Sequence, residues 1–282
     1  MKKIHFPLLV FSLVAGLFCS NSPDHLQYSA LEKKNERGAD SLLAQRFAPP
    51  PGFARKQADS SSFAYFLRHL PLKPSGSKVR YFNGEEKENL GVYEAVVDLP
   101  IGRKDLHQCA DAVIRLRAEY LWHTRQFDKI SFHFTNGFPV DYEHWRKGGR
   151  VKVVQNRALW VDTAAPSDSY QAFWAYLETI FSYSGTLSLS KELRSKTIAD
   201  LQIGDVFIRG GSPGHAVMVV DVAENARGEK VFLLAQSYMP AQEIQILKNP
   251  NDTALSPWYS SNFGEKLKTP EWMFDKNELK GF

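Results

Sequence analysis

The last third of the chain carries the pattern that most limits how this protein can fold. Between about residues 203 and 248, short β-branched and apolar runs alternate with turns rich in glycine, proline and asparagine. This alternation is typical of consecutive antiparallel strands. The longest run, residues 215–222 (HAVMVVDV), directly follows the turn at residues 210–214 (GGSPG). The sequence therefore predicts a β meander over about residues 203–248.

The strongest helical pattern precedes the meander, over about residues 105–123. Asp105 and Gln108 fit a capping box, with Asp105 at the N-cap position and Gln108 at N3. Apolar side chains then recur at helical spacing, which favours a helix with one buried face. They are Leu106, Cys109, Ala110, Val113, Leu116 and Tyr120. Cys109 is therefore predicted in the first turn, on the apolar face, and a helix packed on the meander gives an α+β fold.

The length of the chain suits one domain with an extension. Hydrophobic residues make up 43% and aromatic residues 13%, which is enough for a substantial core. The three prolines at residues 49–51 cannot continue a helix. We therefore predict a polar tether over residues 20–52 and a single α+β domain over residues 53–282.

The start of the sequence has the form of a secretory signal. Lys2-Lys3 precede an apolar run at residues 6–18, and the chain turns polar after Cys19. A basic start and a short apolar core are typical of a signal peptide, here residues 1–19, and the core is too short for a membrane span. Residues 13–19 (LVAGLFC) resemble a bacterial lipobox, which implies a lipid on Cys19 that anchors the protein to a membrane. The alternative is cleavage slightly later and a periplasmic protein, so both places in the cell envelope stay open.

Charge and composition exclude several partners. The formal net charge is +4, and Lys2-Lys3 contribute two of those charges, which leaves no basic surface suited to nucleic acid. The pair His107-x-Cys109 has no second pair at the spacing that zinc needs. We therefore expect no nucleic-acid partner, no metal and no other cofactor.

Three residues in a specific order suggest covalent chemistry. The sequence has two cysteines, and if Cys19 is lipidated or removed, Cys109 is unpaired. Exported proteins normally pair their cysteines, so a single thiol is a candidate reactive group, although an inert buried cysteine is the alternative. A helix N-terminus stabilises a thiolate, an imidazole can take the thiol proton, and a third polar group can orient the ring. Cys109, His215 and Gln236 supply these three groups.

The meander also carries a family resemblance. Residues 203–222 (IGDVFIRGGSPGHAVMVVDV), followed by residues 232–237 (FLLAQS), resemble the C-terminal half of the NlpC-type cell-wall peptidases of the papain-like superfamily. The resemblance implies a papain-like α+β fold, with residues 128–165 as an insertion. It also implies that Cys109 is the nucleophile, His215 the base and Gln236 the orienting residue. The cysteine motif departs from the usual Asp-Cys-Ser-Gly, since residues 108–111 read Gln-Cys-Ala-Asp.

A second resemblance covers about residues 45–275 and is to a family known as domain of unknown function 4846 (DUF4846), which implies no activity. The matching runs are LPLKPSGSKV (70–79), DLHQCADAVIRLRAEYLW (105–122), HFTNGF (133–138), GDVFIRGGSPGHAVMVVDV (204–222) and AQSYMPAQEIQIL (235–247). Two functions stay open. One is an exported cysteine amidase or peptidase that acts on cell-wall peptides or similar amides. The other is a non-catalytic envelope lipoprotein that binds glycan or peptide, since one scaffold can serve many functions.

Overall fold

The computed structural model describes residues 40–282. The predicted signal peptide over residues 1–19, the lipid on Cys19 and the first part of the predicted tether lie outside the described residues. Within residues 40–282, no helix is both long enough and apolar enough to cross a membrane.

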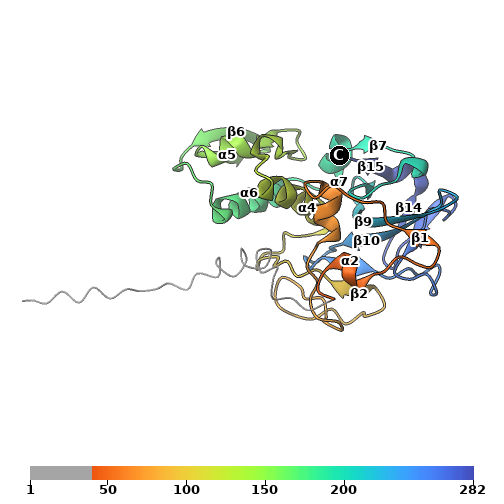
Figure 1. Ribbon diagram of the computed structural model, residues 1–282. Helices are drawn as coiled ribbons and strands as arrows, with labels where there is room; N and C mark the ends of the chain where they lie inside the picture. The colour runs from red at the N-terminus through yellow and green to blue at the C-terminus, as the bar shows by residue number, and fades with distance from the viewer. Residues whose placement is uncertain (1–39) are drawn as a thin grey trace, which may run out of the picture.

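One antiparallel sheet organises the described part of the chain (Figure 1). Its centre consists of strands that follow one another in sequence and lie side by side, in the range predicted for the meander. They are β8 (Val206–Arg209), β9 (His215–Asn225), β10 (Lys230–Gln236) and β11 (Gln245–Leu247). Consecutive strands pair because short turns join them, as in any meander. Beyond β11 the sheet continues with β2 (Tyr93–Val96).

The C-terminal part of the chain returns to this sheet. β15 (Leu279–Gly281) pairs with β8, and β7 (Arg194–Ser195) pairs with β15 at the sheet edge. The short strands β1 (Phe53–Ala54) and β12 (Tyr259–Ser260) pair with β9 and β10, respectively. A separate hairpin forms from β13 (Lys266–Lys268) and β14 (Met273–Asp275). The buried side chains of Leu267 and Phe274 in this hairpin pack in one of the two hydrophobic cores.

Both faces of the sheet are covered, as β9 illustrates. Successive side chains of a strand point to opposite faces. Accordingly, Ala216 and Met218 pack in one core with α4 (Cys109–His123), whereas Val217 and Val219 pack in the other with Phe274. Since all four β9 side chains are buried, the strand reads as a continuous apolar run in the sequence. The described chain is therefore an α+β domain with the cysteine-bearing helix on an antiparallel sheet.

The start of the cysteine helix differs from the prediction. α4 begins at Cys109, with Gln108 as the N-cap residue, and not near residue 105. The Asp105 carboxylate instead accepts hydrogen bonds from the Gln108 side chain at 3.2 Å and from the Ala241 backbone N–H at 2.7 Å. Asp111 accepts the Gln108 backbone N–H at 2.9 Å and so takes the N3 position in the capping box. Asp105 thus ties the preceding loop to the β10–β11 connection, and Cys109 is the first helical residue.

The remaining helices cover the sheet or extend away from it. They are α2 (Leu43–Arg46), α3 (Phe63–Arg68), α5 (Tyr142–Arg146), α6 (Tyr170–Tyr183) and α7 (Thr186–Glu192), with 3₁₀ turns η1 (Phe127–Lys129), η2 (Ile198–Asp200) and η3 (Lys276–Glu278). The predicted insertion at residues 128–165 contains α5 and two hairpins. These are β3 (Ser131–His133) with β4 (Pro139–Asp141), and β5 (Gly149–Val154) with β6 (Arg157–Asp162). In Figure 1 this unit lies at the left, next to α6 and away from the sheet.

The folded part begins earlier than the predicted tether boundary at residue 52. Leu43 in α2 is fully buried, and its backbone N–H donates to the Leu70 carbonyl at 3.0 Å. Phe47 is also buried in the core next to the sheet. α2 ends at Arg46, shortly before the three prolines, and the segment that contains it already belongs to the domain. The sequence prediction took the polar neighbours of this segment as evidence for a tether.

Candidate active site

The three predicted site residues come together at one end of the sheet. Cys109 opens α4, His215 opens β9 and Gln236 ends β10. Since β9 and β10 run antiparallel and α4 packs against both, these positions meet. The His215 ring Nε2 lies 2.8 Å from the Gln236 side-chain Oε1. Cys109 and His215 both line a cleft of about 600 Å³.

The glycines before His215 are required by close packing. A side-chain carbon on Gly214 would lie 2.4 Å from both the Gly211 carbonyl and the Thr186 hydroxyl oxygen. A side-chain carbon on Gly210 would lie 2.2 Å from the Ser190 hydroxyl oxygen. Both glycines therefore let the turn pack against α7, and this packing forms one wall of the cleft beside His215.

Apolar and hydroxyl side chains dominate the cleft. Its apolar lining comes from Phe181, Leu187, Pro213, Tyr238, Met239 and Trp272, and its hydroxyl groups from Thr135, Ser184, Thr186 and Ser212. Leu187 and Met239 are unusually exposed for such residues, at 39% and 62%. The cleft thus has an apolar rim and neutral hydrogen-bonding groups, which suits a ligand with both apolar and amide surfaces.

Burial keeps Cys109 in the thiol form. Burial, with a smaller contribution from the nearby Asp111 carboxylate, raises the pKa of the Cys109 thiol to about 11. Backbone N–H groups of Ala110 and Ala216 act in the opposite direction. The side chain is 7% exposed. The expected stabilisation of a resting thiolate by the helix start is therefore outweighed by desolvation.

The thiol is expected to react slowly with iodoacetamide at neutral pH. Because only the thiolate reacts, the rate in the folded protein should keep rising with pH up to the thiol pKa of about 11. The same protein unfolded in urea should show the ordinary thiol pKa of about 8.5. Rates would be measured by mass spectrometry of the Cys109 peptide. Fast alkylation of the folded protein at pH 6 would contradict this expectation.

The His215 ring is neutral and can accept a proton. Burial, opposed by the hydrogen bond to Gln236 and aided by the positive charge of Lys87, lowers the pKa of His215 to about 4. The ring is therefore uncharged at neutral pH. If the Gln236 oxygen accepts the Nε2 proton, Nδ1 is the nitrogen that can accept another proton. Within residues 40–282 the structure contains no hydrogen bond between the Cys109 sulfur and this ring.

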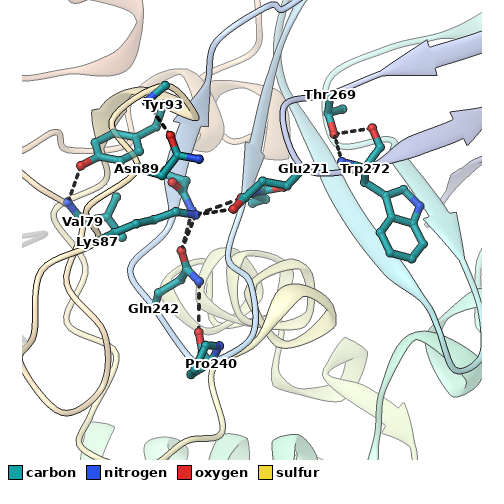
Figure 2. A network of polar contacts seen from close by, with 12 residues as sticks. Val79, Lys87, Asn89, Tyr93, Pro240, Gln242, Thr269, Glu271 and Trp272 are labelled. Atoms are coloured by element: carbon teal, nitrogen blue, oxygen red, sulfur yellow. Dashed lines mark hydrogen bonds and ion pairs between the residues drawn. The ribbon is translucent and has the colours of Figure 1, made fainter.

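Two further charged residues lie behind Gln236. Its side-chain Nε2 donates to Glu271 Oε2 at 2.7 Å. Glu271 in turn pairs with Lys87 Nζ at 2.8 and 2.9 Å, and Lys87 also donates to the Gln242 side-chain oxygen at 3.0 Å (Figure 2). Next to Glu271, the Trp272 ring centroid lies 5.4 Å from that of His215. The sequence did not predict Lys87 or Glu271 at the site, because neither residue belongs to a local motif and both reach Gln236 only through tertiary contacts.

Almost all of the described chain matches a known sequence family. The sequence model of a family described as "Domain of unknown function (4846)" matches residues 43–281. The chain belongs to this family. The predicted DUF4846 membership is therefore confirmed, and the match extends from the first residue of α2 to the last residue of β15. No curated protein and no solved structure matches the chain. The NlpC-type likeness stays a prediction.

Asp111 contributes a carboxyl group to the lining of the cleft in this DUF4846 domain. Burial raises the pKa of its carboxyl group to about 8, although the Gln108 backbone N–H opposes this effect. The second carboxyl oxygen is buried and has no hydrogen-bond partner in the described structure. Asp111 therefore carries a proton for most of the time at neutral pH. Among residues 40–282 no group of three or more histidine, cysteine, aspartate or glutamate side chains has the arrangement of a metal site.

Proposed function

We propose that the protein is a cysteine hydrolase that cleaves amide bonds, with Cys109 as the nucleophile and His215 as the base. The observation that supports it most is the His215–Gln236 hydrogen bond. This bond directs Nδ1 to act as the acceptor in the cleft that also contains the first residue of α4. A nucleophile, a base and an orienting group are the three parts of this chemistry.

The reaction begins from a neutral pair. As the Cys109 sulfur attacks the substrate carbonyl carbon, the thiol proton passes to His215 Nδ1. The first N–H groups of α4 have no partner one turn earlier in the helix and can stabilise the negative oxygen. The C–N bond then breaks, and His215 returns the proton to the leaving amine, which leaves a thioester on Cys109. Water activated by His215 cleaves the thioester, releases a carboxylic acid and restores the thiol.

The lining of the cleft and the sequence predictions favour a peptide substrate in the cell envelope. Neutral hydroxyl groups and the exposed apolar side chains of Leu187 and Met239 suit a peptide better than a highly charged ligand. The signal-like start and the resemblance to NlpC-type peptidases add support for cell-wall peptides and for a papain-like scaffold. Under this proposal the protein acts outside the cytoplasm, held to a membrane if Cys19 carries a lipid.

The direct test is digestion of isolated peptidoglycan and its soluble fragments by the mature protein. We expect new peptide fragments, each with a free amine and a free carboxylate, in mass spectra of the products. Cys109→Ala should reduce product formation at least 10³-fold, because no other group can form the thioester. Asp162→Asn, at a side chain that is 86% exposed and does not line the cleft, should retain the activity. Equal product formation by Cys109→Ala would overturn the proposal.

The burial of Cys109 supports a second candidate function. A thiol that is 7% exposed and has its pKa raised to about 11 also suits a non-catalytic protein that binds peptide or glycan in the same cleft. For this function, calorimetry would show binding of peptidoglycan fragments with equal affinity in the wild type and in Cys109→Ala, and neither protein would release products.

A further inference from the structure

The network behind Gln236 gives a role to a residue that does not touch the proposed pair. We propose that Glu271 is a positioning residue that selects which ring nitrogen of His215 carries the proton, by fixing the direction of the Gln236 side-chain amide. The catalytic consequence rests on the proposed function above. The effect on the histidine ring does not, and it can be measured separately.

The first step concerns the amide of Gln236. An amide side chain has a donor end and an acceptor end, and rotation by 180° exchanges them. Glu271 presents a carboxylate, which accepts hydrogen bonds only. Its contact at 2.7 Å with Gln236 therefore requires the amide nitrogen on that side. The amide oxygen must then face His215 at 2.8 Å.

The second step concerns Glu271 itself, which is held on two sides. Lys87 is 4% exposed and contacts both carboxylate oxygens, so the carboxylate is held in place. The backbone around Glu271 forms a local turn, in which the Thr269 hydroxyl oxygen accepts a hydrogen bond from the Trp272 N–H at 3.1 Å (Figure 2). Gln242 accepts from Lys87 and orders the far side of the ammonium group.

The third step concerns the histidine. With the Gln236 oxygen as its partner, His215 Nε2 must donate, so the neutral ring carries its proton there and Nδ1 is the acceptor. If the amide rotated, its NH₂ group would face Nε2, and the ring proton would move to Nδ1. A ring with its proton on Nδ1 cannot take the proton of Cys109 through that atom. Glu271 thus selects the competent form through Gln236.

The test is the ¹⁵N NMR spectrum of the histidine rings in the mature protein, with the His215 signals assigned by their loss in His215→Ala. The wild type should show the Nε2–H form alone. In Lys87→Met/Glu271→Leu, a substantial fraction should change to the Nδ1–H form. The double replacement removes both charges, so that no buried ammonium is left without a partner. Glu265→Leu, at an exposed ion pair with Lys276 in the same part of the chain, should leave the spectrum unchanged.

A third replacement provides a rescue. Adding Gln236→Glu to the double variant supplies a carboxyl group at a buried position. At alkaline pH, where that group is ionised and can only accept, the Nε2–H form should return without Glu271. If the protein hydrolyses amides, kcat of the double variant should fall about tenfold to a hundredfold with KM little changed, since the rotated amide gives the wrong tautomer part of the time.

The outcomes separate the two proposals. An Nδ1–H ring in the wild type, or an unchanged ring in the folded double variant, would overturn the role of Glu271 and leave the hydrolase proposal standing. A tautomer change in a protein that shows no hydrolysis would support the role of Glu271 and count against the hydrolase. If the double variant does not fold, Glu271→Gln takes its place. Its amide oxygen would accept from Lys87 and turn its NH₂ group toward Gln236, so part of the Nδ1–H form should appear, and an unchanged ring would overturn the role of Glu271.

Discussion

Replacing Asp221 by asparagine is expected to lower the free energy of unfolding by about 3–5 kcal/mol, the usual cost of removing one member of a buried ion pair. Asp221 lies in β9 and is fully buried. Its two carboxylate oxygens accept from Arg55 Nε and Arg68 Nε, each at 2.7 Å. An asparagine would turn a donor toward one arginine and leave the buried Arg68 and the partly buried Arg55 without their carboxylate.

Urea unfolding followed by circular dichroism would measure this loss. Asp162→Asn is the matched control, because the Asp162 side chain is 86% exposed and contacts only a histidine ring in the described structure. The control should change the free energy of unfolding by less than about 0.5 kcal/mol. A loss below about 1 kcal/mol in Asp221→Asn would mean that the arginines find other partners, such as the backbone carbonyls that Arg68 already contacts.

Replacing Asp111 by asparagine is expected to have the opposite effect and to depend strongly on pH. Burial raises the pKa of Asp111 to about 8, whereas in the unfolded chain it is near 3.8. Between these values the folded protein binds the proton more tightly, so wild-type stability from this group is present below pH 3.8 and is lost as pH rises to 8. Asparagine cannot ionise and still offers an oxygen to the Gln108 N–H. The variant should therefore be more stable than wild type by about 2–4 kcal/mol at pH 8.

The measurement is the difference in unfolding free energy between Asp111→Asn and wild type from pH 4 to pH 9. All other groups titrate in both proteins, so the difference isolates Asp111. It should be near zero at pH 4, grow up to pH 8 and stay constant above that value. A difference that does not vary with pH would show that the carboxyl group is ionised in the folded protein throughout this range. Asp162→Asn again serves as the control.

The predictable parts of this fold are the elements whose apolar residues form a local pattern in the sequence. The apolar run of β9 and the helical stripe of α4 are local patterns, and both elements lie where the patterns indicated. The predicted start of α4 was wrong. Asp105 fits the capping pattern in the sequence, but in the structure it contacts Ala241, which lies 136 residues further along the chain. The residues around Asp105 do not indicate this distant contact.

The same limit applies to the candidate site: only the residues in local motifs were predictable. Cys109, His215 and Gln236 follow local motifs, whereas Glu271 and Lys87 contact the site only through tertiary structure. The protonation of Cys109 also depends on tertiary structure. A helix start favours a thiolate, but the degree of burial decides the outcome, and burial is a property of the whole domain.

The origin of the site from distant segments has a consequence for biosynthesis. Cys109 emerges from the ribosome early, but Gln236 and Glu271 emerge only after more than a hundred further residues. β15, which pairs with β8, emerges later still. A nascent chain that has already formed α4 therefore lacks the partners of His215. Any reactivity of Cys109 that depends on them can arise only after most of the domain has been translated, which would limit reaction of the thiol in the nascent chain.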